Sequence, residues 1–186
     1  MTETETLFNG RWLKLMRRGT WEYAERTNPG GAAVIVATTT ADEVLYVEQF
    51  RVPIGMPTIE MPAGLIGDSE EHRDEDIIAS AHRELEEETG YRAASIELIM
   101  RGPSSAGMSS EFMAFVRATG LTRVGPGGGH PGENIVVHHV PRAQCAAFLA
   151  QKSASGHAVD PKMYAGLYFL ERDARGRPWP DLAGPT

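Results

Sequence analysis

The feature that most constrains this chain is an acidic segment that ends in the run Arg83-Glu-Leu-Glu-Glu-Glu-Thr-Gly90. Residues 68–88 hold ten acids and two arginines, a charge of −8, whereas the whole chain of 186 residues carries −7. On a helix, at about 100° per residue, the side chains of Glu84, Glu87 and Glu88 share an arc of about 100°. Apolar residues of the segment fall beside this arc, so we expect these carboxylates at the edge of the core.

Such an arrangement costs free energy unless the carboxylates have a partner. Like charges three or four residues apart destabilise a helix by about 0.2–0.5 kcal/mol per pair, and burying an unpaired carboxylate costs more. Mg²⁺ takes oxygen ligands and is often held by one or two carboxylates together with substrate phosphates. The segment therefore predicts a metal site that faces a cleft, with a solvated acidic helix face as the alternative.

The remainder of the chain predicts strands and helices in irregular order. Helix 74–89 is expected to carry acids in its first turn and to end at Gly90, and the Pro- and Gly-rich tail from residue 173 onward is expected as surface coil. Strands are expected within 10–27 and at 32–37, 44–50, 59–64, 94–100, 112–118 and 135–140, with further helices at 141–151 and 161–170. Without a regular βαβ alternation, this order indicates an α+β fold or an α/β sandwich.

Composition excludes several classes of protein. The single cysteine, Cys145, excludes an intramolecular disulfide and any Cys/His zinc spacing, and is expected as a small core residue. Lysines and arginines form no cluster, so no nucleic-acid partner is expected. No apolar run approaches the roughly 20 residues that cross a bilayer. We therefore expect a cytoplasmic protein without a membrane partner.

The acidic run resembles a known motif. Gly64 and Glu70, together with the run from Arg83 to Tyr91, are similar to the Nudix box, G-x5-E-x7-R-E-U-x-E-E-x-G-U, where U is aliphatic or aromatic. The second half matches at every fixed position, but twelve residues instead of seven separate Glu70 from Arg83. The box, residues 64–91, is thus expected to be expanded by five residues, with either Glu70 or Glu75 as its first glutamate.

Other segments resemble the ADP-ribose pyrophosphatase branch of the Nudix family. They are Trp21-Glu-Tyr-x-x-Arg26, Glu48-Gln-Phe-Arg51, Glu60-Met-Pro-Ala-Gly64 and Asp160-Pro-Lys-Met-Tyr164. The resemblance implies a Nudix fold, an α+β architecture of the α/β/α sandwich kind with a mixed central sheet. It divides the chain into an N-terminal β-rich dimerisation and base-binding segment at 1–30, a Nudix domain at 31–172 and a C-terminal coil at 173–186. It also implies a homodimer that hydrolyses nucleoside diphosphate sugars.

The resemblance implies roles for individual residues. Mg²⁺, with Mn²⁺ as a substitute, is expected on the Ala63 carbonyl and on a set of carboxylates: Glu84, Glu87, Glu88 and Glu133. The expected catalytic residues are Arg83, Glu84, Glu87 and Glu133. The expected substrate-binding residues are Trp12, Trp21, Glu22, Arg26, Arg51 and Met108, the last in a loop at 102–110. For the two tryptophans, core or dimer packing is the alternative.

The catalytic base stays open. In this branch a mobile loop carries the base two residues before the metal-ligand glutamate, where this chain has Pro131. The base is then Glu133, a box glutamate or a metal-bound hydroxide, with His130 as a further candidate. The glycine run at 125–129 lacks Gly-Lys-Ser/Thr, so we expect a flexible lid rather than a P-loop.

Together these observations predict a Mg²⁺-dependent pyrophosphohydrolase that cleaves ADP-ribose to AMP and ribose 5-phosphate. One alternative keeps the chemistry and changes the substrate to GDP-mannose or another nucleoside diphosphate sugar. Another is a Nudix module that binds a nucleotide without hydrolysing it. Product analysis with and without metal distinguishes the three.

Overall fold

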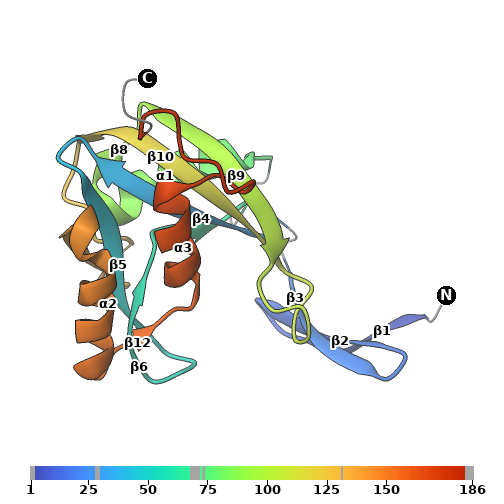
Figure 1. The fold of residues 1–186 in the computed structure, drawn as a ribbon. Helices are drawn as coiled ribbons and strands as arrows, with labels where there is room; N and C mark the ends of the chain where they lie inside the picture. Colours follow the sequence, from blue (N-terminus) through green and yellow to red (C-terminus); the bar gives the residue numbers. More distant parts are fainter. Residues whose placement is uncertain (1–2, 28–29, 68–71, 73, 131, 183–186) are drawn as a thin grey trace.

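The computed structural model describes residues 3–27, 30–67, 72, 74–130 and 132–182. Within them, a small N-terminal sheet projects from a larger body that carries the helices (Figure 1). The small sheet is antiparallel and consists of β1 (Thr4–Asn9), β2 (Leu13–Arg18) and β3 (Trp21–Arg26). Strands β2 and β3 agree with the short strands expected within 10–27, whereas β1 lies outside that range and was not predicted.

The larger sheet has nine strands among the described residues, and it is mixed. Its main path runs β12-β6-β5-β4-β10-β8, with β11 paired to β5, β7 to β4 and β9 to β10. The pairs β10–β4 and β12–β6 are parallel and the others antiparallel. The strands are β4 (Ala32–Thr39), β5 (Glu43–Arg51), β6 (Met56–Glu60), β7 (Ala63–Leu65), β8 (Tyr91–Arg92), β9 (Ser95–Pro103), β10 (Phe112–Arg123), β11 (Val136–Pro141) and β12 (Ala158–Val159).

Strand β4 lies at the centre of the core, since apolar side chains cover both of its faces. Val34 and Val36 pack with residues of the helices α2 (Cys145–Ala154) and α3 (Lys162–Glu171). Ile35, on the other face, packs with residues of α1 (Ile77–Thr89). A strand buried on both faces is typical of a sheet between two helical layers. The α+β fold with a mixed central sheet is thus confirmed.

Helix α1 begins later than the sequence predicts. Its first residue is Ile77, and the Asp76 side chain accepts hydrogen bonds from the backbone N–H groups of Ile78 and Ala79 at 2.9 and 2.8 Å. The expectation of acids in the first turn is therefore wrong. A carboxylate before the helix satisfies two otherwise free N–H groups, and this favours Asp76 as the cap. At the other end, Gly90 has φ +75°, as expected for the residue that ends a helix.

The C-terminal tail is coil in its described part, but it packs more closely than predicted. Trp179 is buried, and its indole N–H donates to the Phe169 carbonyl at 2.8 Å. The Arg117 guanidinium lies 4.4 Å from the Trp179 ring and bonds Asp181 at 2.7 Å. Burying a large aromatic side chain outweighs the conformational freedom of a Pro- and Gly-rich tail. Among the described residues, no helix is long and apolar enough to cross a bilayer.

Glu48 joins several segments on one side of the sheet. Its carboxylate accepts a hydrogen bond from Lys152 Nζ at 2.6 Å and lies 2.9 Å from His138 Nε2 and 3.2 Å from His157 Nε2. Burial raises the pKa of Glu48, but these hydrogen bonds outweigh burial and lower it to about 2. The charged carboxylate therefore stabilises the folded chain.

Replacing Glu48 by glutamine tests this contribution. Because the folded pKa is lowered, the stabilisation is present above the ordinary pKa of about 4.5 and is lost as pH falls through 2. At pH 7 we expect E48Q to lower the free energy of unfolding by about 1–3 kcal/mol. Denaturant unfolding at pH 7, 4.5 and 3 measures the difference, with the exposed Glu3 replaced by glutamine as control. A constant difference across this pH range would contradict the assignment.

Candidate active site

A cavity of about 390 Å³ lies between β7, the second half of α1 and the facing strands β5 and β6. It brings together six of the residues that the sequence assigns to the site: Arg26, Arg51, Ala63, Glu84, Glu88 and Glu133. These residues come from the N-terminal sheet, the large sheet, helix α1 and the loop before β11. The fold therefore assembles one site from segments that lie far apart in the sequence.

Helix α1 presents two of the three carboxylates of the predicted arc, Glu84 and Glu88, to the cavity, whereas Glu87 does not line it. Glu84 and Glu88 are 9% and 6% exposed, while Leu85 between them is fully buried in the core. Glu86 points away and pairs with Arg92 at 3.0 Å on the exposed side. The apolar contacts of the helix fix its rotation, and this rotation keeps the two carboxylates in the cavity.

Gly64 allows α1 to lie directly against β7. A Cβ atom built on Gly64 would overlap the Glu84 carboxylate. The missing side chain thus makes room for a charged group at the point where strand and helix meet. This gives a physical reason for the glycine at the first position of the box.

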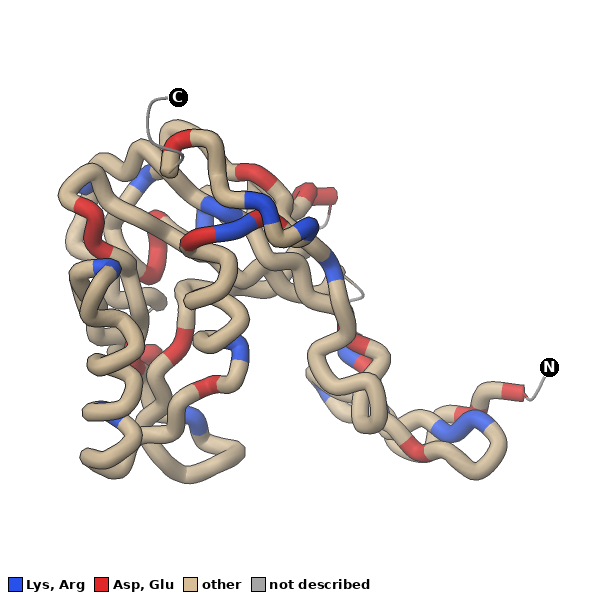
Figure 2. Tube along the Cα trace, in the orientation of Figure 1, with Lys and Arg blue, Asp and Glu red and all other residues tan. Residues whose placement is uncertain are grey.

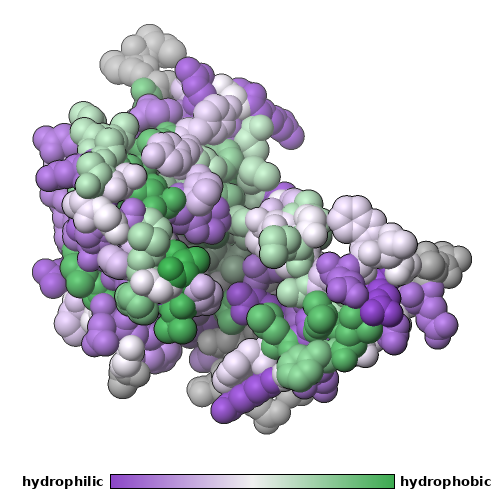
Figure 3. Space-filling view, turned by 90° about the horizontal axis from the view of Figure 1, so that it is seen from below, coloured by the Kyte–Doolittle hydropathy of each residue, from purple (hydrophilic) through white to green (hydrophobic). Residues whose placement is uncertain are grey.

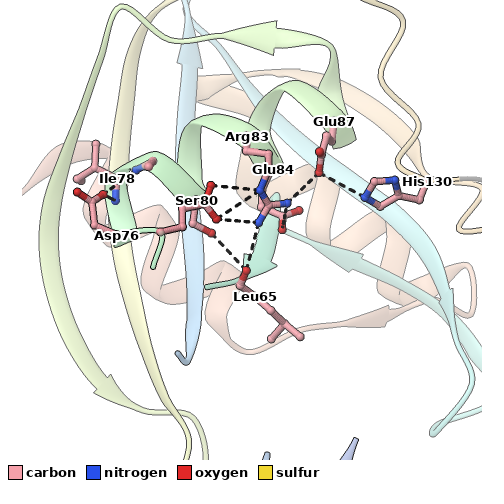
Figure 4. A network of polar contacts seen from close by, with 10 residues as sticks. Leu65, Asp76, Ile78, Ser80, Arg83, Glu84, Glu87 and His130 are labelled. Carbon is pink, nitrogen blue, oxygen red and sulfur yellow. Dashed lines mark hydrogen bonds and ion pairs between the residues drawn. The ribbon is translucent and has the colours of Figure 1, made fainter. Parts of the chain in front are cut away.

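Arg83 organises the acidic side chains around it (Figure 4). Its guanidinium donates to Glu84 at 2.8 Å, to Glu87 at 3.0 Å and to Glu75 at 3.1 Å, and it also bonds the Leu65 carbonyl at 3.3 Å. Burial alone would lower the pKa of Arg83, but the bonds and charges of Glu75 and Glu84 outweigh burial and raise it. A permanent cation therefore holds the glutamates in place.

The expanded loop of the box is only partly described. Glu75 lies within the described residues and reaches Arg83. Glu70, the other candidate for the first box glutamate, lies outside them. The contact with Arg83 favours Glu75 in that role.

The buried Glu88 carboxylate lies near the carboxylates of Glu84 and Glu133. Burial raises its pKa to about 8, and the charges of Glu84 and Glu133 add to the rise. A hydrogen bond from the Ala63 N–H to Glu88 Oε2, at 3.0 Å, opposes it. A site that makes a carboxylate this reluctant to ionise favours a cation.

The glycine run at 125–129, which the sequence predicts as a flexible lid, makes backbone hydrogen bonds to the end of α1. Gly128 N–H donates to the Glu88 carbonyl at 2.8 Å, and Gly129 N–H donates to the Glu87 carbonyl at 3.0 Å. The run is thus bound to the end of α1, because the last turn of a helix leaves carbonyl groups that need donors. The next described residue, His130, points toward Glu87, with Nε2 at 3.5 Å from its carboxylate (Figure 4).

The donor set of the cavity fits a hard divalent cation. Carboxylates of Glu84, Glu88 and Glu133 line one cavity, and oxygen ligands of this kind suit Mg²⁺ or Mn²⁺. Among the described residues, no group of three or more His, Cys, Asp or Glu side chains is already arranged to hold a metal ion. In this structure the carboxylates have other partners: Glu84 accepts a hydrogen bond from Arg83, and Glu88 accepts one from the Ala63 N–H.

Cations line the same cavity as these carboxylates. Arg51 makes two hydrogen bonds to Glu60, at 2.6 and 2.7 Å, and these bonds raise the pKa of Arg51 despite its burial. Lys162 also lines the cavity and pairs with Asp160. Guanidinium and ammonium groups are the usual partners of phosphate oxygens. Lys162 lies in the segment Asp160–Tyr164 that resembles the pyrophosphatase branch, but the resemblance gave it no role of its own. It begins α3, shortly after β12, which pairs with β6.

Among the described residues, Arg26 is the one from the N-terminal sheet that lines the cavity, and it pairs with Glu111. The sequence did not assign Glu111, whose contact with Arg26 spans 85 positions and has no local signal. Four predicted substrate-binding residues do not line the cavity in this chain: Trp12, Trp21, Glu22 and Met108. Glu22 pairs with Arg17 at 3.1 Å, and the other three side chains are 64–73% exposed. Met108 contributes a backbone contact, since its carbonyl accepts the Ala24 N–H at 2.8 Å.

Comparison with known proteins agrees with this geometry. The model of the NUDIX domain family matches residues 28–156, so the chain belongs to the Nudix family. The chain is 31% identical to the ADP-sugar pyrophosphatase of Mus musculus over 189 residues, covering 89% of this chain and 84% of that protein. It is 32% identical to the methanol dehydrogenase activator of Bacillus methanolicus and 31% identical to the ADP-ribose pyrophosphatase of Bacillus subtilis. These two matches cover 65% and 59% of this chain, and 66% and 60% of the relatives.

A solved structure supports the same fold. The crystal structure of an ADP compounds hydrolase superposes with a TM-score of 0.65 at 18% identity, covering 90% of this chain and 89% of that one. The fold, the family match and the pyrophosphatase relatives support a Nudix diphosphatase of the ADP-ribose pyrophosphatase branch. The resemblance seen in the sequence is thereby confirmed.

Replacing Gly64 by alanine tests the close approach of β7 and α1. The added methyl group overlaps Glu84, so we expect G64A to lower the free energy of unfolding by about 1–3 kcal/mol. In an E84A background the same change is expected to cost less than half as much. Denaturant unfolding measures both, with G107A as control, because a Cβ there has no neighbour within 4 Å. Equal costs in both backgrounds would disprove the contact.

Proposed function

We propose that this Nudix protein hydrolyses ADP-ribose to AMP and ribose 5-phosphate and depends on Mg²⁺, with Mn²⁺ as a substitute. The observation that carries the proposal is the cavity that Glu84, Glu88 and Glu133 line together with Arg51 and Lys162. Such a site offers carboxylates for a metal and cations for a diphosphate. The mouse ADP-sugar pyrophosphatase and the Bacillus subtilis ADP-ribose pyrophosphatase, to which the chain is similar, indicate the class of substrate.

Each residue of the cavity has a part in this scheme. Glu84, Glu88 and Glu133, with the Ala63 carbonyl, would hold the metal, which when bound neutralises phosphate charge and lowers the pKa of a water molecule. Arg83 keeps Glu84 and Glu87 oriented through the bonds described above. Hydrolysis then adds a water oxygen to one phosphorus and breaks its bond to the bridging oxygen.

Arg51 is the proposed partner of the substrate diphosphate. Its guanidinium already forms a bidentate pair with Glu60, so its position in the cavity is fixed before substrate arrives. For the base, Pro131 has no ionisable side chain. The neighbouring His130 donates its N–H to the Glu133 carboxylate at 2.8 Å, and its Nε2 lies 3.5 Å from the Glu87 carboxylate. We propose Glu133 or a box glutamate, with a metal-bound hydroxide as the alternative.

We also propose a homodimer in which the N-terminal sheets pair. This sheet exposes several large apolar side chains, namely Phe8, Trp12, Leu13, Leu15 and Trp21, and of its apolar residues only Met16 is buried. Figure 3 shows hydrophobic side chains gathered on this projecting part of the molecule. A second copy would cover them, and the two tryptophans would stack on the adenine base near Arg26 and Glu22.

We expect no nucleic-acid partner. Figure 2 shows basic positions scattered among acidic ones, whereas a surface that binds nucleic acid needs clustered basic residues.

Charge-removing variants of α1 test the metal assignment. We expect E84Q and E88Q to lower turnover of ADP-ribose at least 100-fold while the fold stays intact, because each removes a proposed ligand of the metal. Purified protein is incubated with ADP-ribose or GDP-mannose, with Mg²⁺ or EDTA, and products are separated by chromatography. E86Q is the matched control, since Glu86 points away from the cavity.

The outcomes separate the alternatives. AMP released only with metal, and faster than GMP, supports the proposal, whereas an excess of GMP changes the substrate and keeps the mechanism. Near-wild-type activity in both E84Q and E88Q would exclude the metal site. Tight ADP-ribose binding without hydrolysis at millimolar Mg²⁺ would instead indicate a binding module.

Trp21→Ala tests the base-binding role of the N-terminal sheet. Stacking on a base contributes about 1–3 kcal/mol, so we expect the KM for ADP-ribose to rise about 10-fold or more with little change in kcat. Analytical ultracentrifugation of the same variant reports the oligomeric state. A change to monomers without a change in KM would assign Trp21 to dimer packing instead.

A further inference from the structure

The carboxyl end of α1 is closed by backbone donors from the segment 124–130. Besides the bonds from Gly128 and Gly129, Val124 N–H and Gly125 N–H donate to the Gly90 carbonyl at 2.8 and 3.1 Å. The carbonyls of Glu87 and Glu88 therefore have partners from outside the helix. Because Glu88 lines the cavity, the segment holds the part of the helix that carries the site.

The two backbones approach so closely that each needs a glycine at the contact. A Cβ on Gly127 would lie 2.5 Å from the Thr89 carbonyl carbon and 2.8 Å from both Glu88 O and Gly90 N. A Cβ on Gly90 would lie 2.8 Å from Gly127 N. Such a contact allows one relative position of segment and helix, because no flexible side chain is available to move aside.

This contact determines where Glu133 lies. His130 N–H donates to the Glu133 carboxylate at 2.8 Å, and Glu133 N–H donates to the His130 carbonyl at 3.1 Å. Ile135 N–H donates to the Gly128 carbonyl at 3.2 Å, which ties the following residues to the same segment. Glu133 lines the cavity with Glu84 and Glu88, and its charge contributes to the raised pKa of Glu88.

We infer that residues 127–129 are a positioning element that sets Glu133 against the carboxylates of α1 before substrate binds. The inference rests on the proposed function only in that Glu133 is taken as a metal ligand. The glycines at 127 and 129 act through Glu133 and touch neither metal nor substrate. Glycine at these positions thus serves close packing rather than mobility.

Mn²⁺ binding without substrate tests the inference, measured as free Mn²⁺ by electron paramagnetic resonance. We expect G127A to weaken Mn²⁺ binding at least 10-fold and to lower kcat, while the KM for ADP-ribose changes less than threefold. The matched control is G156A, because Gly156 also has a positive φ, of +88°, and a Cβ there has no neighbour within 4 Å. G156A reports the cost of alanine in this backbone conformation alone.

A double-mutant cycle with E133Q shows whether Gly127 acts through Glu133. If it does, G127A/E133Q binds Mn²⁺ no more weakly than E133Q alone. Additive losses, or wild-type Mn²⁺ binding in G127A or in E133Q, would overturn the inference, as would a wild-type protein that binds no Mn²⁺. Should G127A fail to fold, G129A takes its place, since a Cβ there meets the Glu133 carboxylate instead of the helix.

The readout separates this inference from the proposed function. A wild-type protein that binds Mn²⁺ but releases no AMP or GMP would disprove the hydrolase, and the cycle would still decide the role of Gly127. Conversely, active hydrolysis with an additive cycle would keep the function and reject the positioning element.

Discussion

The contact between β7 and α1, where Gly64 leaves room for the Glu84 carboxylate, is the constraint on which the rest of the structure depends. Helix α1 cannot rotate, because Ala81 and Leu85 are fully buried against β4. With that rotation fixed, Glu84 and Glu88 have to lie at the edge of the core. The helix and its neighbouring elements then supply the cation and the hydrogen-bond donors that offset the free-energy cost of burying two carboxylates.

These partners come from different segments and have different chemistry. Arg83 supplies a cation from the helix itself, Ala63 supplies a backbone N–H from β7, and the glycine segment supplies donors to the helix end. Asp76 satisfies free N–H groups at the other end of the helix. The helix therefore remains stable although three of its carboxylates repel each other along one side.

What the sequence could predict is what depends on local periodicity or on a contiguous motif. The turn angle of a helix was sufficient to bring Glu84 and Glu88 together, and the motif supplied Ala63 and Glu133. Lys162 lies in the motif segment 160–164, but the motif alone does not say that this side chain reaches the cavity. Glu111 could not be found in this way, because an ion pair across 85 positions brings it there. The contacts of the glycine run could not be predicted for another reason. Glycine suits both mobile loops and closely packed backbones, and composition does not distinguish the two.

The charges of the cavity bear on how its two proposed ligands would bind. Arg26 is paired with Glu111, Arg51 with Glu60 and Glu84 with Arg83, and among the described lining residues five glutamates outnumber the three cations Arg26, Arg51 and Lys162. A diphosphate alone would meet the carboxylates of α1 as like charges, and a divalent cation alone would meet Arg51 and Lys162. When both ligands are bound, the cation offsets the carboxylate charges that repel the diphosphate. The diphosphate in turn offsets the charges of Arg51 and Lys162 that repel the cation. The charge distribution therefore favours both ligands over either one, and this coupling has the same size whichever ligand binds first.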